Sequence, residues 1–183
     1  MEIIETLIAD LKLVRSREYE DSRGTFSRSY CMRDFEILIG SRTLKQINLS
    51  LTHKIGAIRG LHLQLPPHSE LKLVRCLKGT VWDVAVDLRQ GSSTFLQWHA
   101  EELSEKNKRV LVIPEGFAHG FQTLTSNCEM LYFHTADYKK DSEGAVNAID
   151  PAVAINWPQP ITERSERDVN HFMLADDFKG IEL

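Results

Sequence analysis

The sequence contains little cysteine, and its three cysteines show no metal-ligand spacing. Cys31, Cys76 and Cys128 are an odd, widely separated set, which does not make a disulfide framework. We expect all three to be reduced residues that serve in packing. The N-terminus also lacks the basic segment followed by an apolar stretch that marks a secretory signal. Together these absences predict a cytoplasmic protein.

Long apolar runs and an excess of basic residues are absent as well. No apolar run approaches the ~20 residues needed to cross a bilayer. The 22 Lys and Arg against 26 Asp and Glu give a formal net charge of −4, which offers no general attraction to nucleic acid or to an anionic membrane. Any anionic ligand must therefore be held by individual Arg and Lys side chains. Because no repeat or linker interrupts the 183 residues, we expect one domain over residues 1–183.

The sequence does contain a series of short strand patterns. In residues 81–88 aromatic and aliphatic side chains alternate with Asp83 and Asp87, so apolar and acidic groups occupy opposite faces. A turn at Gly79 predicts that residues 72–77 and 81–88 form a hairpin. Many short strands indicate an all-β sandwich or jelly roll. Further strands are predicted over residues 7–14, 44–51, 57–64, 110–113 and 129–138, and short helices over residues 32–38 and part of the tail beyond Glu163.

Residues 46–51 show a second alternation. Gln46, Asn48 and Ser50 fall on one side of this predicted strand, and three aliphatic residues fall on the other. If the aliphatic side packs between sheets, the polar side is solvated. If the polar side lines the interior of a barrel, its amides and hydroxyl would contact a polar ligand. The pattern leaves both arrangements open.

The run of residues 58–64 places an imidazole on a segment that is otherwise typical of a strand. Histidine changes its protonation near neutral pH, so His62 is a candidate for proton transfer, with a hydrogen-bonded structural histidine as the alternative. Lys72, which follows a Pro-Pro turn, and His119, which lies in a loop containing proline and glycine, are candidates for the same pocket.

Arg59 lies on the same predicted strand and carries a charge that needs an anion if it is buried. Strict alternation places Arg59 and His62 on opposite faces. Both can therefore reach one pocket only if Gly60 marks a bulge or a bend in the strand.

Metal binding is an alternative for this pocket. His62, Gln64, Glu70 and His119 lie near the positions at which cupin barrels carry their metal ligands, and Pro114-x-Gly116-x-x-His119 resembles the second cupin motif. However, Gln64 stands where the first motif has its second histidine, and a neutral amide is a poor substitute for imidazole on zinc or iron. We therefore expect no metal, and a barrel that works by acid and base alone.

A resemblance to one family extends from about Leu7 to Asp168. The motifs that carry the resemblance are Asp21-x-Arg23-Gly24-x-Phe26, Gln46-x-Asn48-x-Ser50, Arg59-Gly60-Leu61-His62-x-Gln64-x-Pro66-Pro67, Lys72-Leu73-Val74-Arg75, Asp83 to Arg89, Ile113 to Phe121, and Leu131-Tyr132. In these motifs the chain resembles the dTDP-4-dehydrorhamnose 3,5-epimerase family, which implies a cupin jelly-roll barrel with a few short helices, a helical tail over about residues 160–183 and no cofactor.

The resemblance also implies the chemistry. A 4-keto sugar has acidified C–H bonds at C3 and C5, and epimerisation removes a proton from one face and returns one to the other. By this match His62 is the base, Asp168 is the carboxylate that holds it, and Tyr132 is the proton donor. Lys72 would stabilise the negative charge that develops on the C4 oxygen.

The remaining matched positions are expected to bind the nucleotide sugar. Arg23 would meet the diphosphate, and Tyr138 would stack on the base. Where the family usually has a glutamate that contacts thymine, this chain has Arg28, which only donates hydrogen bonds and would suit the cytosine of a CDP-sugar better. The other positions expected to contact substrate are Phe26, Gln46, Asn48, Ser50, Arg59, His119, Glu143 and Arg167.

Members of the family are typically homodimers in which an N-terminal strand crosses to the neighbour, so the region of Arg23 and Phe26 would complete the partner's site. Two activities stay open beside inversion at C3, C5 or both. One is a cupin that binds a sugar nucleotide without turnover, and the other is a ketoisomerase that moves the ketone between C3 and C4.

Overall fold

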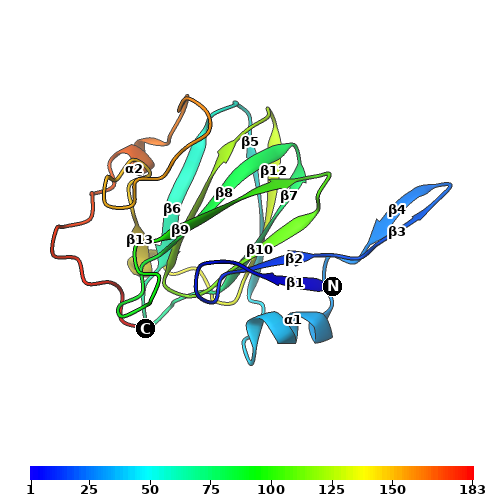
Figure 1. Cartoon of the computed structure of the whole chain (residues 1–183), viewed down its shortest axis with the longest axis horizontal. Helices are drawn as coiled ribbons and strands as arrows, with labels where there is room; N and C mark the ends of the chain where they lie inside the picture. The colour runs from blue at the N-terminus through cyan, green and yellow to red at the C-terminus, as the bar shows by residue number, and fades with distance from the viewer.

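Two antiparallel sheets dominate the computed structural model, which describes residues 1–183 (Figure 1). One sheet has six strands in the order β1-β2-β10-β7-β12-β5, and the other has five in the order β13-β6-β11-β8-β9. The all-β prediction is therefore confirmed. The six strands are β1 (Glu2–Glu5), β2 (Lys12–Arg15), β10 (Arg109–Ile113), β7 (Lys72–Lys78), β12 (Cys128–His134) and β5 (Gln46–Thr52), and the five are β13 (Glu143–Ala145), β6 (Ile58–Gln64), β11 (Phe117–Thr123), β8 (Thr80–Asp87) and β9 (Trp98–Ser104).

The space between the two sheets changes from apolar to polar along the strands. On β7 and β12, Cys76 and Met130 belong to a core of 14 buried residues that includes Phe117 and Phe121 of the facing sheet. On β7, Val74 lies two residues before Cys76, and Lys72 lies four residues before it. The period of two thus places a packed core at one end of the interior and leaves the other end to polar side chains.

Part of the outer face of each sheet is covered. Helix α1 (Met32–Ile39) buries Phe35 and Ile39 against the six-stranded sheet. The residues after β13 bury Val146 and Val153 against Val84 and the other outward residues of β8. Because β8 is covered on both faces, its Asp83 and Asp87 are fully buried on the inner side, and the predicted separation of acidic and apolar faces is confirmed.

Three local predictions are wrong. The turn at Gly79 does not make a hairpin, because β7 pairs with β10 and β12 while β8 belongs to the other sheet. The chain crosses between sheets there, with Gly79 at a φ of 78°. Residues 7–14 are not one strand, since β2 begins at Lys12 after a turn in which Asp10 has a φ of 67°.

The predicted helical tail is the third. Helix occupies only α2 (Glu166–Val169) within residues 160–183. The rest follows the barrel surface: Ile181 donates its backbone N–H to the Leu88 carbonyl at 2.7 Å, and Leu174 and Phe178 pack against the apolar cluster outside β8. These backbone bonds to the barrel replace the hydrogen bonds that a helix would make within itself.

No helix of the structure has the length and apolar character that a membrane span requires.

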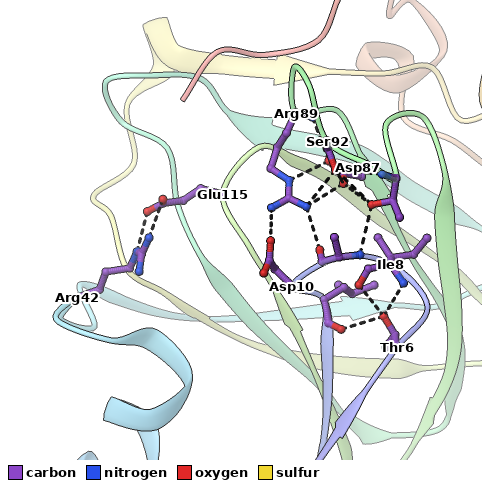
Figure 2. Close-up of polar contacts among 11 residues, drawn as sticks. Thr6, Ile8, Asp10, Arg42, Asp87, Arg89, Ser92 and Glu115 are labelled. Carbon is purple, nitrogen blue, oxygen red and sulfur yellow. Dashed lines mark hydrogen bonds and ion pairs between the residues drawn. The ribbon is translucent and has the colours of Figure 1, made fainter.

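Polar contacts of Arg89 fix the N-terminal turn to the end of the barrel (Figure 2). Arg89 bonds Asp10 Oδ2 at 2.6 Å, the Ala9 carbonyl at 2.9 Å and Asp87 Oδ2 at 2.8 Å. Burial opposes ionisation of Asp87, but donors from Arg89, Ser92 and Thr94 outweigh it and lower the pKa of this carboxyl. Arg42 and Glu115 make a separate two-pronged ion pair beside α1.

A two-stranded hairpin, β3 (Glu18–Asp21) and β4 (Gly24–Ser27), projects from the body of the barrel (Figure 1). Its base is held by the ion pair between Lys108 and Glu18. At its tip Arg23 bonds its neighbour Asp21 at 2.6 Å, and Phe26 is 70% exposed. The hairpin therefore presents a cation and an aromatic ring to solvent, with no cover from its own chain.

Candidate active site

A cavity of about 930 Å³ opens at the polar end of the space between the sheets. Twelve of the fifteen residues predicted to act on or bind substrate line it, and the three exceptions all lie on or just after the projecting hairpin. The twelve are Gln46, Asn48, Ser50, Arg59, His62, Lys72, His119, Tyr132, Tyr138, Glu143, Arg167 and Asp168. The three outside it in this chain are Arg23, Phe26 and Arg28.

A bulge in β6 brings Arg59 and His62 into the same cavity. His119 pairs with His62 and Phe121 pairs with Arg59, so β6 carries one residue more than β11 between these two pairs. Gly60 occupies the bulge with a φ of 129°, and a Cβ there would lie 2.6 Å from the Gly120 Cα. The position therefore needs glycine, and the predicted bulge at Gly60 is confirmed.

His62 is held by a buried carboxylate. Its Nε2 lies 2.7 Å from Asp168 Oδ1, while Asp168 is 3% exposed. Helix α2 positions this carboxyl, because the Asp168 backbone N–H donates to the N-cap Ser165 Oγ at 3.1 Å. Burial opposes ionisation, but the hydrogen bond and charge of His62 outweigh it and lower the pKa of Asp168 to about 2. An ionised Asp168 holds the proton on Nε2, so Nδ1 is the nitrogen available as a base.

Tyr132 stands on the opposite sheet from His62. Its hydroxyl lies 2.9 Å from Ser50 Oγ of the neighbouring strand β5, and its ring packs edge-on to His119 with centroids 6.3 Å apart. Burial raises the pKa of the phenol well above its ordinary value. The group is therefore protonated at neutral pH and can act as a donor, not as a base.

Lys72 of β7, Glu70 just before this strand and His134 of β12 form the wall beside Tyr132. Lys72 Nζ lies 2.9 Å from Glu70 Oε1, and His134 Nδ1 lies 2.8 Å from Glu70 Oε2. Lys72 Nζ also donates to the His62 carbonyl at 3.4 Å. The ammonium thus lies between the strand that carries the base and the strand that carries the phenol, the place where charge on a bound ketone oxygen would be stabilised.

His119 has a carboxylate partner of its own. Its Nε2 lies 2.9 Å from Asp83 Oδ1 across the β11–β8 pair. Burial, opposed by His119, raises the pKa of the fully buried Asp83. The pair fixes the His119 ring in the cavity wall.

The two arrangements left open for residues 46–51 are now distinguished. Gln46, Asn48 and Ser50 line the cavity, and Gln46 donates to the Ala136 carbonyl at 2.8 Å. The aliphatic side faces outward, with Leu49 67% exposed. The polar side is thus the interior one, and the aliphatic side does not pack between sheets within this chain.

Gln64 and the other residues of the metal alternative have protein partners. The Gln64 carbonyl oxygen accepts from the Lys139 N–H at 2.7 Å, and its amide donates to the Asp137 carbonyl at 3.2 Å. Gln64 therefore tethers the loop that precedes β13, which carries Tyr138. Glu70 and His119 are likewise bonded to Lys72, His134 and Asp83.

Another set of potential ligands, His62, Asp168 and His171, has donor atoms within 4.8 Å of one another. The 2.7 Å contact between His62 and Asp168 is shorter than two ligands about 2 Å from a shared tetrahedral metal would be apart. The Arg167 guanidinium also lies 3.3 Å from His62 Nε2. These contacts fit a hydrogen-bonded base better than they fit a metal centre.

Several residues in or beside the cavity are not predicted as site residues by any motif. His134 was missed, although it lies two residues from Tyr132 and so shares its face of β12. Asp83 belongs to an alternating strand and to a motif that carries the family resemblance, but neither predicts its contact with His119. Arg164 and His171 give no signal in the tail. Their roles depend on partners from distant strands and loops, which local spacing does not show.

Comparisons with known proteins agree with this geometry. The family model for dTDP-4-dehydrorhamnose 3,5-epimerase matches residues 5–176. The chain is similar to the Sinorhizobium fredii dTDP-4-dehydrorhamnose 3,5-epimerase, with 44% identity over 170 residues, 92% of this chain and 87% of that protein.

Two solved structures have the same fold. The Elizabethkingia anophelis dTDP-4-dehydrorhamnose 3,5-epimerase superposes with a TM-score of 0.90 at 39% identity and covers 97% of this chain and 98% of that one. The Legionella pneumophila dTDP-6-deoxy-D-glucose-3,5-epimerase, solved with dTDP-4-keto-L-rhamnose, gives a TM-score of 0.82 at 37% identity over 100% of this chain and 92% of that one.

Proposed function

The chain belongs to the dTDP-4-dehydrorhamnose 3,5-epimerase family and is an isomerase, and we propose that it inverts carbons beside the ketone of a nucleotide-linked 4-keto-6-deoxyhexose by proton transfer between His62 and Tyr132. One observation carries the proposal. A carboxylate-held imidazole on one sheet of a cupin-type barrel faces a protonated phenol on the other, across a cavity large enough for a sugar ring.

His62 is the base in this scheme. Its Nδ1 takes the proton from C3 or C5, and the electron pair of the broken C–H bond moves toward the C4 oxygen to form an enolate. Asp168 accepts the Nε2–H at 2.7 Å and stabilises the imidazolium that forms. The reverse assignment, with Tyr132 as base and His62 as acid, is disfavoured because Tyr132 is protonated and Asp168 is ionised before the reaction starts.

Lys72 stabilises the enolate. Its ammonium is nearly buried and lies on the wall between the two reacting groups. A preorganised charge in a water-poor site is worth far more than the same charge in water. Lys72 is therefore expected to act on the transition state more than on binding of the ketone.

Tyr132 returns a proton to the other face of the same carbon. The phenolic O–H bond breaks as the new C–H bond forms, and the enolate electrons collapse to restore the ketone. Ser50, 2.9 Å from the phenol oxygen, donates to the phenolate until a proton from solvent replaces the lost one. Inversion at one carbon leaves His62 protonated, so solvent must reset both groups before a second carbon reacts.

The nucleotide is expected to extend from the sugar toward Tyr138, which lines the cavity and is 56% exposed. The Legionella neighbour was solved with a dTDP sugar, which supports dTDP-4-dehydro-6-deoxyglucose as the first substrate to test. Arg28 favours a different base, since a guanidinium donates to the acceptors of cytosine but cannot accept from the thymine N–H. A CDP-linked sugar is therefore the second candidate.

We further propose a homodimer whose hairpins complete each other's cavities. Arg23 and Phe26 lie on a projecting hairpin with no cover, and β5 is an edge strand whose outward Ile47, Leu49 and Leu51 are 60%, 67% and 44% exposed. An open edge with an apolar face invites pairing with another chain. A second copy would cover this face and bring the cation of Arg23 to the diphosphate.

All three cysteines are unpaired, which suits the proposed cytoplasmic location.

Deuterium incorporation tests the function directly. The protein is incubated in heavy water with dTDP- and CDP-4-keto-6-deoxyglucose in parallel, and the sugar is followed by proton NMR. Label at C3 or C5 together with appearance of the inverted sugar would support the proposal. The nucleotide that gives this result would show whether the substrate carries thymine or cytosine. Absence of exchange with both nucleotides would instead indicate a protein that binds a sugar without turnover, and ketone migration without inversion would indicate a ketoisomerase.

A further inference from the structure

A third imidazole–carboxylate pair, beside those of His62 and His119, lies in the same cavity and has no part in the proposed proton transfer. His134 and Glu70 both line the cavity, and the His134 side chain is only 13% exposed. Nδ1 of His134 lies 2.8 Å from Glu70 Oε2. The ring stacks beside that of Tyr132, with centroids 6.1 Å apart and planes 24° apart.

Strand pairing places this pair directly against the catalytic lysine. His134 of β12 is the cross-strand partner of Lys72 of β7, and Glu70 lies two residues before Lys72 in the chain. The Glu70 carboxylate bridges the two, with Oε1 at 2.9 Å from Lys72 Nζ and Oε2 bonded to His134. Each oxygen of the carboxylate therefore has a different cationic or N–H partner.

Glu70 is ionised under all ordinary conditions. Burial opposes its charge, but the hydrogen bond from His134 and the charge of Lys72 outweigh it and lower the pKa of Glu70 to about 2. Because an ionised carboxylate only accepts hydrogen bonds, Nδ1 of His134 must carry a proton. The other contact to Oε2 is the Gln64 amide at 3.5 Å, at the limit of a hydrogen bond.

The full negative charge of Glu70 beside Lys72 weakens the stabilisation that the Lys72 ammonium can give to the enolate. The closer the carboxylate sits to the ammonium, the smaller the field that reaches a substrate oxygen, since the two charges cancel at a distance. A carboxylate left with Lys72 as its single strong partner would turn both oxygens toward it. His134 prevents this by holding Oε2 on the far side of the carboxylate.

We propose that His134 is a positioning residue that acts through Glu70 to keep Lys72 in place and incompletely neutralised, so that the ammonium can stabilise the enolate. The inference rests on the proposed epimerisation and extends it to a residue that does not touch substrate. Lys72, Glu70 and His134 then form one unit, in which Lys72 acts on the substrate and the histidine sets the geometry of its counter-ion.

Steady-state kinetics of paired variants test this. We expect His134→Ala to lower kcat on the order of tenfold, less than the loss of a direct oxyanion donor, with KM changed less than twofold. His134→Gln, whose amide can still donate to Glu70, should recover most of that loss. In a Glu70→Gln background, His134→Ala should cause little further loss, because its effect passes through the carboxylate.

The matched control is His68→Gln. His68 lies two residues before Glu70 and bonds Ser142 Oγ at 3.0 Å but does not line the cavity, so its kcat should stay at the wild-type value. A raised KM with unchanged kcat in His134→Ala would overturn the proposal and show direct contact with substrate. An equal loss in the wild-type and Glu70→Gln backgrounds would also overturn it.

A second measurement needs no substrate and so separates this proposal from the proposed function. The ¹⁵N signal of the Lys72 ammonium reports its distance from Glu70. We expect this signal to move in His134→Ala and to stay in place in His68→Gln. A signal that does not move in His134→Ala would overturn the proposal whatever reaction the protein catalyses, whereas a wild-type protein with no turnover would count only against the epimerase function.

Discussion

The Nε2 atom of His62 lies 2.7 Å from Oδ1 of Asp168, a carboxylate delivered from the other end of the chain by a single turn of helix. The contact leaves Nδ1 as the free nitrogen of an imidazole that lines the cavity. Because the carboxylate fixes which nitrogen of His62 carries the resting proton, we expect Nδ1 to take the proton in the proposed reaction.

Replacing Asp168 by Asn should remove most of the activity while keeping the fold. The amide would favour the wrong tautomer of His62 and would not stabilise the imidazolium, a change that costs as much as about 10⁴-fold in kcat in comparable pairs. Stopped assays with the labelled sugar would measure it. Glu166→Gln, an exposed carboxylate on the same helix turn, is the control and should retain wild-type kcat; a fully active Asp168→Asn would show that His62 works without this partner.

Gly60→Ala tests whether the bulge in β6 sets the site. The new Cβ would meet the Gly120 Cα at 2.6 Å, at a φ of 129°, so we expect a loss of about 2–4 kcal/mol in the free energy of unfolding and a marked fall in kcat as His62 moves. Urea unfolding gives the first quantity. Gly91→Ala, at a φ of 74° with open space around it, should lose only about 1 kcal/mol, and an equal loss at both glycines would rule out the close approach as the cause.

Some of this arrangement could be predicted from the sequence and some could not. The alternation in β8 and β5 predicted which residues share a face, because period two is a local property of a strand. It could not tell that β7 and β8 lie in different sheets, since a turn at Gly79 serves either connection. The bulge at Gly60 could be predicted because Arg59 and His62, on either side of it, can reach one pocket only if the strand alternation is broken there.

Sequence patterns predicted less of the tail over residues 160–183 and of the cavity wall that contains Glu70 and His134. Asp168 could be assigned only through family resemblance, because 106 residues separate it from His62. The contact between Glu70 and His134 spans 64 residues, and it depends on the pairing of β7 with β12, which no pattern predicted. Residues 160–183 contain good helix formers, yet their backbone bonds to the barrel instead.

Acid stability should depend on Glu70. Its pKa is lowered from 4.5 to about 2 in the folded protein, so its ionised form stabilises the fold above pH ~4.5 and this contribution is lost as the pH falls toward ~2. The shift corresponds to about 3 kcal/mol, and Asp168, lowered to about 2 as well, should add to the same slope. Urea unfolding between pH 6 and 2 would measure it.

In Glu70→Gln the fall in unfolding free energy over that range should be smaller than in the wild type. Asp176→Asn, at an exposed position in the tail, should leave the slope unchanged. If Glu70→Gln kept the full wild-type slope, the carboxyl would not be the ionised partner of Lys72 and His134.

Mixing two inactive variants tests the shared site. If Arg23 completes the partner's cavity, Arg23→Ala and His62→Ala are each inactive as homodimers, but a mixed dimer has one site with both residues intact. By the symmetry of a two-fold dimer, an equilibrated equal mixture should regain about a quarter of wild-type activity. Analytical ultracentrifugation would confirm the dimer, and a mixture that stays inactive despite subunit exchange would mean that each chain supplies its own Arg23.

The most direct test of the account separates proton removal from proton return. In heavy water, Tyr132→Phe should still exchange the C–H bond beside the ketone, because His62 remains, but should yield no inverted sugar, since the donor on the opposite face is gone. His62→Asn should show neither exchange nor inversion. Proton NMR of the sugar records both events in one sample. Wild-type exchange in His62→Asn, or full inversion in Tyr132→Phe, would contradict the assignment of base and acid to the two facing sheets.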